Sequence, residues 1–388
     1  MYELLWLLLP VAAASGWLAA KRSTKVEKTK PCFDISSDYF KGLNYLLDER
    51  PDKAIEVFIR MVEVDNDTVE THLALGSLFR RRGEVDRAIR IHQNLIARPT
   101  LNNDQKNIAL MELAQDYMKA GLLDRAENLF EELMKNKSQI GNSLKHLIDI
   151  YQQEQDWEKA IETSVQYEFH TGKQYGHVIA NYCCEMAVKA KLEGDQQQFK
   201  GCLKQAFDYD KNCVRANIML AQSEQKTGHY LEAIQYFKKV ISEDIDYLPE
   251  IIHDIQECFS KGNIDNGMDV LLEDIMSRYD GISPLLYKAD DLLKKGEAKQ
   301  AMHLMVDQLR QRPSVRGLKW LVEQNLELSG GRAHENLVVL NDLIESLLKG
   351  KPVYECHDCG FKGKSMHWQC PGCKQWNSVK PIKGIEAE

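Results

Sequence analysis

Glycine, proline and alternating strand patterns are scarce in this sequence. The 388 residues include 23 glycines and 10 prolines, few of them in the middle of the chain, and apolar and polar residues seldom alternate there. Because half-buried strands read as such alternation between turn residues, these absences argue against a β-rich fold. Low-complexity tracts are also lacking, and 44% hydrophobic with 28% charged residues is ordinary for a folded protein. We therefore predict an all-α protein.

An excess of basic charge and the common catalytic motifs are missing too. The formal net charge is −8, whereas domains that bind nucleic-acid backbones are usually basic. The sequence contains no G-x-S-x-G, no phosphate-binding glycine loop and no H-E-x-x-H. Its many carboxylates lie on expected helix faces, where solvation explains them. These absences predict a protein that is neither an enzyme nor a nucleic-acid binder.

The ten cysteines do not suggest a disulfide-rich secreted protein. Four lie together near the C-terminus, and Cys32 stands alone. The others are scattered over expected helices, where a free cysteine usually serves as a small buried hydrophobe; they are Cys183, Cys184, Cys202, Cys213 and Cys258. This distribution predicts a reducing compartment.

The N-terminal segment predicts a membrane anchor. Leu4 to Ala20 is a run of 17 residues without a charge, which as a helix spans about 25 Å and lies at the lower end of the range that crosses a bilayer. Basic residues cluster directly after it, between Lys21 and Lys30, and such residues are retained on the cytoplasmic side. We expect a single-pass anchor over residues 1–20, a basic juxtamembrane linker over 21–34, and the soluble part facing the cytoplasm. A cleavable signal peptide is the alternative, although its positive charge should precede the apolar run.

A period of 34 residues runs through the middle of the chain. Small residues recur at Ala54, Ala88, Ala126, Ala160, Ala233, Gly267 and Ala301, most of them 34 residues apart, with a degenerate unit centred on Phe199 in the long gap. This helix-turn-helix period resembles the tetratricopeptide repeat, in which small residues let two antiparallel helices approach and a glycine ends the first helix. We expect about eight repeats over residues 35–315, followed by capping helices over 316–350. The same register predicts core positions at Tyr45, Phe58, Tyr117, Phe130, Met219 and Phe237.

Basic residues are expected on the first helices of the early repeats. By register, Arg80 and Arg81 face the concave groove of the solenoid, with Lys119 and Lys145 in comparable positions further along. A groove of this charge suits an acidic or carboxylate-bearing peptide. A solvated charged face without a ligand is the simpler interpretation, and the sequence leaves both open.

Residues 351–381 carry a metal-binding motif, followed by a tail over 382–388. Cys356, Cys359, Cys370 and Cys373 form C-x2-C-x10-C-x2-C, in which each cysteine pair can bind one edge of a tetrahedral ion. Gly360 and Gly372 are expected to provide the backbone angles that the two turns need. The motif predicts one metal ion in a closed four-cysteine site of structural type, with zinc favoured and iron as the alternative.

Three aromatic residues surround this motif, Phe361, Trp368 and Trp376. They could stack on the bases of a nucleic acid or pack against the adjacent helices. Packing is the interpretation that we favour.

The order of these segments resembles one family. An N-terminal anchor, about eight tetratricopeptide repeats and a C-terminal ribbon with the sequences CHDC and CPGC are together similar to the lipopolysaccharide assembly protein B family of Gram-negative bacteria. The likeness covers essentially the whole chain. It implies an all-α, tetratricopeptide-repeat superhelical solenoid with an N-terminal transmembrane helix and a small C-terminal rubredoxin-like zinc ribbon. It also implies a location in the bacterial inner membrane.

The resemblance further implies a function and partners. Members of the family are thought to regulate lipopolysaccharide synthesis as adaptors that promote degradation of the lipid A pathway deacetylase by the membrane AAA protease. A lipopolysaccharide-sensing membrane protein is a further implied partner, and a homo-oligomer is compatible with the sequence. Two other functions stay open at this point, a rubredoxin-like electron-transfer component and a nucleic-acid-binding zinc-ribbon protein.

Overall fold

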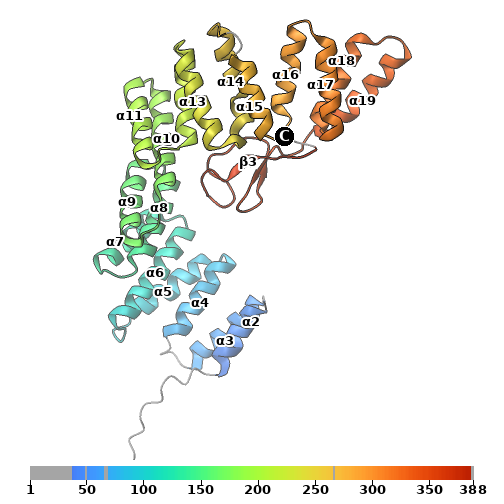
Figure 1. The fold of residues 1–388 in the computed structure, drawn as a ribbon. Helices are drawn as coiled ribbons and strands as arrows, with labels where there is room; N and C mark the ends of the chain where they lie inside the picture. Colours follow the sequence, from blue (N-terminus) through green and yellow to red (C-terminus); the bar gives the residue numbers. More distant parts are fainter. Residues whose placement is uncertain (1–36, 49, 65–68, 265–266, 386–388) are drawn as a thin grey trace, which may run out of the picture. The chain divides into compact units, whose positions relative to one another are not determined.

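The computed structural model describes residues 37–48, 50–64, 69–264 and 267–385 (Figure 1). The predicted anchor and the juxtamembrane linker lie outside these residues. Within the part of the chain that is described, no helix is both long enough and apolar enough to cross a bilayer. The chain divides into two compact units, Met1–Ile150 and Tyr151–Glu388.

Helices in consecutive pairs build the first unit. They are α2 (Ser37–Leu47), α3 (Pro51–Val64), α4 (Val69–Arg82), α5 (Val85–Ile96), α6 (Asn103–Lys119), α7 (Leu123–Lys135) and α8 (Ile140–Glu154), the last of which continues into the second unit. α2 packs on α3, α4 on α5, and α6 on α7. Gly83 and Gly121 end the first helix of their pairs with φ of +88° and +75°, a backbone conformation that glycine adopts without steric cost.

The helices of the second unit follow the same plan (Figure 1). They are α9 (Trp157–Thr171), α10 (Gly176–Glu193), α11 (Gln196–Tyr209), α12 (Val214–Lys226), α13 (Tyr230–Glu243), the short 3-10 helix η2 (Ile245–Tyr247), α14 (Leu248–Lys261), α15 (Gly267–Arg278), α16 (Ser283–Lys294), α17 (Ala298–Gln311), α18 (Val315–Leu328) and α19 (Arg332–Leu348). Within it, α10 packs on α11, α12 on α13, α16 on α17, and α18 on α19.

The small residues of the repeat lie where the helices of a pair meet. Ala54, Ala88, Ala126, Ala160, Ala233 and Ala301 are all 0% exposed. At the corresponding Gly267, an added Cβ would lie 2.5 Å from the ring of Phe259, so even a methyl group would not fit there without movement. The predicted core positions are buried as well, with Tyr45 partly buried at the edge of its cluster. The all-α repeat architecture predicted from the period is therefore confirmed.

A small sheet follows α19. Its strands are β1 (Tyr354–Cys356), β2 (Lys362–Gly363) and β3 (Val379–Pro381), in the order β2-β1-β3, with both pairs antiparallel. We call residues 354–381 the ribbon. In Figure 1 it lies beside the helices of the second unit.

Candidate metal centre and interaction surfaces

Two turns with the same hydrogen-bond pattern present the four cysteines of the ribbon. In the first turn, the N–H of Gly360 donates to the carbonyl of Cys356 at 2.9 Å. In the second, the N–H of Lys374 donates to the carbonyl of Cys370 at 2.9 Å. The residue four positions after the first cysteine is left-handed in both turns, with φ of +72° at Gly360 and +62° at Lys374.

Only part of the expectation for the glycines is confirmed. Gly360 has the predicted positive φ, but in the second turn that conformation falls on Lys374 and not on Gly372. Gly372 serves another purpose: an added Cβ would lie 3.3 Å from Cys359 Sγ and 3.7 Å from Cys370 Sγ. Its missing side chain leaves space directly beside the sulfur atoms.

The four sulfur atoms form one cluster. The Sγ atoms of Cys356, Cys359, Cys370 and Cys373 all lie within 4.8 Å of one another. Cys356 Sγ is 3.7 Å from Cys373 Sγ, and Cys359 Sγ is 3.6 Å from Cys370 Sγ. A tetrahedral ion with metal–sulfur bonds of about 2.3 Å separates its ligands by roughly 3.8 Å, so this donor set fits one metal ion. Four thiolates complete the shell, and the site is therefore of the closed, structural kind.

The surroundings of Cys356 favour its thiolate. Burial raises the pKa of this thiol, but hydrogen bonds with Ser378 and with the backbone amides of Cys359 and Asp358 more than offset that effect and lower it to about 6. Cys356 Sγ lies 3.3 Å from Ser378 Oγ. Such outer contacts orient a sulfur ligand and favour the deprotonated form that binds metal.

Aromatic side chains dock the ribbon on the helices of the second unit. Trp368 stacks on Tyr247, with ring centroids 5.1 Å apart. Trp376 meets the ring of Tyr182 at 5.8 Å and that of Trp157 at 6.5 Å, both edge to face. The packing that we favoured for these tryptophans is confirmed. Stacking on nucleic-acid bases loses its support, because both indoles already face other rings.

Arg215 of α12 lies between the two tryptophans. Its guanidinium carbon is 5.6 Å from the ring centroid of Trp368 and 5.9 Å from that of Trp376. The side chain is largely buried, and its Nη1 lies 2.8 Å from a carboxylate oxygen of Glu185. A desolvated cation over aromatic faces contributes about 2 kcal/mol, so Arg215 adds specificity to the docking.

Polar contacts continue along the same interface. The ammonium of Lys380 pairs with Asp244, and that of Lys383 lies 2.6 Å from Asp246. The phenol of Tyr354 donates to Glu250. At the far ends, Gln369 Nε2 donates to Gln152 Oε1 at 2.7 Å, and the N–H of Val315 donates to the carbonyl of Ile385 at 2.7 Å; these contacts reach α8 and α18.

Sequence reasoning missed the helix side of this interface. Arg215, Tyr247 and Asp244 sit on positions that the repeat period does not distinguish from an ordinary core or surface site. The aromatic residues of the ribbon are the one signal in the sequence. They indicate that the ribbon packs against other parts of the chain, but not which helices it contacts.

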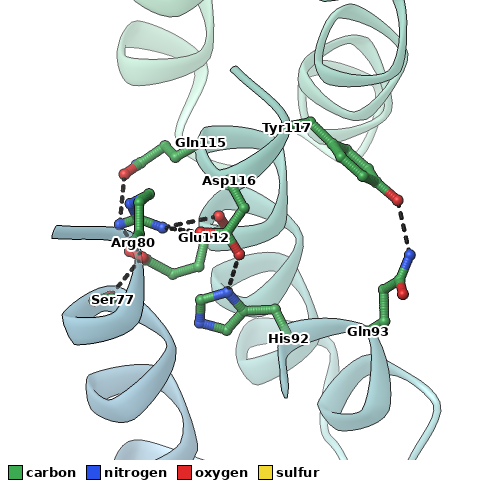
Figure 2. Close-up of polar contacts among 8 residues, drawn as sticks. All are labelled: Ser77, Arg80, His92, Gln93, Glu112, Gln115, Asp116 and Tyr117. Carbon is green, nitrogen blue, oxygen red and sulfur yellow. Dashed lines mark hydrogen bonds and ion pairs between the residues drawn. The ribbon is translucent and has the colours of Figure 1, made fainter. Parts of the chain in front are cut away.

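In the first unit, the predicted groove residue Arg80 takes part in a network of ion pairs (Figure 2). Arg80 of α4 reaches across to α6, where Nη2 lies 2.6 Å from Glu112 and Nη1 lies 2.7 Å from Asp116. The other oxygen of Asp116 lies 2.5 Å from Nδ1 of His92, which is fully buried. Two carboxylates therefore compensate the charge of Arg80, and it fastens one repeat to the next.

The other three predicted groove residues are exposed. Arg81 and Lys119 lie at the ends of α4 and α6, and Lys145 lies on α8. Lys145 and Arg80 share His146 as a neighbour. The pKa of His146 is lowered chiefly by burial, and the positive charges of Lys145 and Arg80 lower it further.

The remaining cysteines of the helices are structural. Cys183, Cys184, Cys202, Cys213 and Cys258 are buried and carry no disulfide. Burial raises the pKa of Cys183 to about 12 and that of Cys258 to about 11, which keeps both as unreactive thiols. Their predicted role as small buried hydrophobes is confirmed.

Family models match both parts of this architecture. A rubredoxin metal binding domain matches residues 354–381, and tetratricopeptide repeats match residues 71–105 and 214–244. A PPR repeat matches residues 113–138. Fold and site thus define a tetratricopeptide-repeat solenoid that carries a rubredoxin-type metal-binding domain with one metal ion in a four-cysteine site.

Relatives of full length narrow this class. The chain is 37% identical to lipopolysaccharide assembly protein B of Escherichia coli, over 100% of both chains. It is 32% identical to lipopolysaccharide assembly protein B of Haemophilus influenzae, again over 100% of both. The chain therefore belongs to the lipopolysaccharide assembly protein B family.

Solved structures of repeat proteins are more distant. The C-terminal part of a TPR repeat-containing protein from Cytophaga hutchinsonii aligns with 70% of this chain and 94% of its own, at 12% identity and a TM-score of 0.38. At that distance the likeness carries no argument about function.

Proposed function

We propose that this protein is a non-catalytic, membrane-anchored adaptor that takes part in lipopolysaccharide assembly. It regulates lipopolysaccharide synthesis by promoting degradation of the lipid A pathway deacetylase by the membrane AAA protease. A lipopolysaccharide-sensing membrane protein is its further partner. The protein sits in the inner membrane as a single-pass protein, with its soluble part facing the cytoplasm.

The observation that carries this proposal is the sequence identity of 37% and 32%, over the full length of both chains, to two relatives named lipopolysaccharide assembly protein B. Stacked helical repeats without a catalytic constellation suit a binding scaffold, because such arrays present an extended surface to partners. The anchor restricts that scaffold to the membrane plane, which raises its effective concentration toward partners in the same membrane.

The docked ribbon suggests how the metal enters this function. Trp368 and Trp376 hold the ribbon against α10, α12 and η2, so the metal ion supports a surface that is shared between ribbon and repeats. Loss of the ion would release the ribbon from that surface. The adaptor would stay anchored in the membrane but would no longer bind its client or the protease.

The test uses bacteria in which this chain replaces the endogenous protein. Cys356→Ser and Cys373→Ser remove metal ligands, and Cys32→Ser removes a thiol outside the cluster as the matched control. We expect the deacetylase to be degraded normally with wild type and with Cys32→Ser, and to accumulate with the ligand variants at equal membrane abundance. Normal turnover of the deacetylase with a metal-free variant would contradict the proposal.

Crosslinking in intact membranes tests the partners separately. The protease or the deacetylase should be captured by the full-length chain. Capture of nucleic-acid machinery in their place would overturn the adaptor mechanism.

A further inference from the structure

A pocket in the second unit gathers four lysines. It lies between α11, α12 and α13 and has a volume of about 460 Å³. Lys200 and Lys204 come from α11, Lys211 from the following loop, and Lys239 from α13. We call this site the lysine pocket. None of its residues takes part in the ribbon interface or in the ion-pair network around Arg80.

The lysine pocket has an uncompensated positive charge. Glu224 is the one acidic residue in its lining, and its carboxylate is occupied by Lys200 at 2.9 Å and by His229 at 2.8 Å. Lys204 and Lys211 are exposed and have no ion pair among the described residues. In a chain with a net charge of −8, a surplus of three positive charges around one pocket marks a site for anions.

An apolar wall completes the pocket. Phe207, Leu220 and Tyr236 line it beside the lysines. Asn217 also belongs to the lining and is 2% exposed. Its Nδ2 donates to the carbonyl of Cys213 at 3.0 Å, whereas its Oδ1 is buried and receives no hydrogen bond. This oxygen has almost no accessible surface, so the apolar wall and not Asn217 is what the pocket offers beside the lysines.

We propose that the lysine pocket binds an acidic peptide segment of a partner protein. Separate ammonium groups on three elements match several carboxylates spaced along an extended peptide, and the aromatic wall accepts an apolar side chain between them. No arginine lines the pocket, and arginine is the residue that phosphate sites commonly use for bidentate contacts.

The proposal concerns binding alone and does not depend on a role in lipopolysaccharide assembly. It also differs from the groove expected on the first unit, where carboxylates of the same chain already compensate Arg80. The acidic partner segment binds between α11, α12 and α13 of the second unit, and not at the predicted groove residues of the first unit.

Fluorescence anisotropy with the full-length chain tests this inference. The probe is a fluorescein-labelled octapeptide of alternating glutamate and leucine, and its glutamine–leucine analogue is the neutral control. We expect saturable binding of the acidic probe that weakens with salt, and no binding of the neutral probe. The double variant Lys204→Glu/Lys211→Glu should weaken binding about tenfold or more, because it places like charges opposite the ligand.

A matched variant separates the pocket from general surface charge. Lys173→Glu/Lys238→Glu reverses two exposed lysines of the same unit that do not line the pocket, and it should bind the probe as wild type does. Equal loss in both double variants, or no loss in the pocket variant, would overturn the proposal. The proposal would also be overturned if inorganic phosphate at millimolar concentration, or phosphatidylglycerol vesicles, displaced the probe under conditions where an unlabelled glutamate–leucine peptide did not.

Discussion

The indole of Trp368 stacks on the phenol ring of Tyr247 with ring planes inclined by 21°, and this pair joins the metal-binding ribbon to the helical repeats. Tyr247 is almost fully buried beneath it, in the same cluster as Leu248 and Ile251 of α14. The ammonium of Lys380, which also comes from the ribbon, lies 4.0 Å from the Tyr247 ring centroid. One aromatic side chain of η2 thus contacts two residues of the ribbon.

Replacing the indole should undock the ribbon without unfolding the repeats. We expect Trp368→Ala to lower stability by roughly 3 kcal/mol, the usual cost of truncating a packed aromatic side chain. Limited proteolysis should then cleave between α19 and the ribbon faster than in wild type. Phe169→Ala is the control, because this aromatic residue is exposed on the same unit and its removal should change neither measurement. Wild-type cleavage rates in the Trp368 variant would show that the stack does not hold the ribbon.

Metal removal should disorder the ribbon. Structural zinc contributes roughly 10–16 kcal/mol to the folding of small modules, far more than this three-stranded sheet can supply itself. A strong chelator should therefore shift the fluorescence of Trp368 and Trp376 toward that of water-exposed indoles, and adding zinc should reverse the shift. A fluorescence spectrum unchanged by complete metal loss would show that the ribbon folds without the ion.

The identity of the ion can be read from the purified protein. We expect elemental analysis to give one zinc per chain and the protein to be colourless. A visible absorption band from iron bound to thiolates would instead support the electron-transfer alternative.

Removing the guanidinium of Arg80 should be costly. Arg80→Met leaves Glu112 and the buried Asp116 without their cation, and breaking a buried ion pair from one side costs roughly 3–5 kcal/mol. Arg81→Met removes the neighbouring exposed guanidinium and should change the free energy of unfolding by less than about 0.5 kcal/mol. Chemical denaturation of both variants compares them directly, and equal effects would contradict the network as drawn in Figure 2.

The same network predicts a loss of stability in acid. Burial raises the pKa of Glu112, but the hydrogen bond and charge of Arg80, together with Ser77, more than offset that effect and lower it below its usual value of 4.5. Because the folded pKa is depressed, the stabilisation is complete above pH 4.5 and disappears as the pH falls through the folded value. Urea unfolding of wild type and Glu112→Gln over this range should give curves that differ most at neutral pH and converge in acid. Parallel curves would rule out this origin.

Gly76 should not tolerate a methyl group. An added Cβ would lie 2.3 Å from Nε2 of His92, which is fully buried and already bound to Asp116. We expect Gly76→Ala to cost about 1–3 kcal/mol through overpacking. Gly201→Ala is the matched control, since nothing lies within 4 Å of its added Cβ, and there the better helix propensity should stabilise the protein by about 0.5–1 kcal/mol. Thermal unfolding distinguishes the opposite signs.

Local repetition made much of this molecule predictable. The period set by Ala54 and Ala88 gave the helix pairs, since each pair buries its small residue against its own partner helix. The two Cys-x-x-Cys pairs gave the metal site for the same reason, because each turn places its own two sulfurs. Information of this kind is contained within a few dozen residues.

Contacts between distant segments could not be predicted. The register predicts that Arg80 faces the groove, but its ion-pair partners on α6 depend on how two repeats stack. Arg215 contacts Trp368, although more than half of the second unit's sequence separates the two residues. No pattern in a single sequence links two such positions. The positive φ at Lys374 likewise follows from its place in the turn and not from its residue type.

The docking of the C-terminal ribbon has a consequence for how the protein is made. Its partners Gln152, Tyr182 and Arg215 leave the ribosome long before Trp368 and Trp376 do. In a product of interrupted translation, the rings of Tyr182 and Tyr247 would therefore lack their cover and form an exposed aromatic surface, which proteases and chaperones bind. Only a fully translated chain that has bound its metal ion can bury this surface.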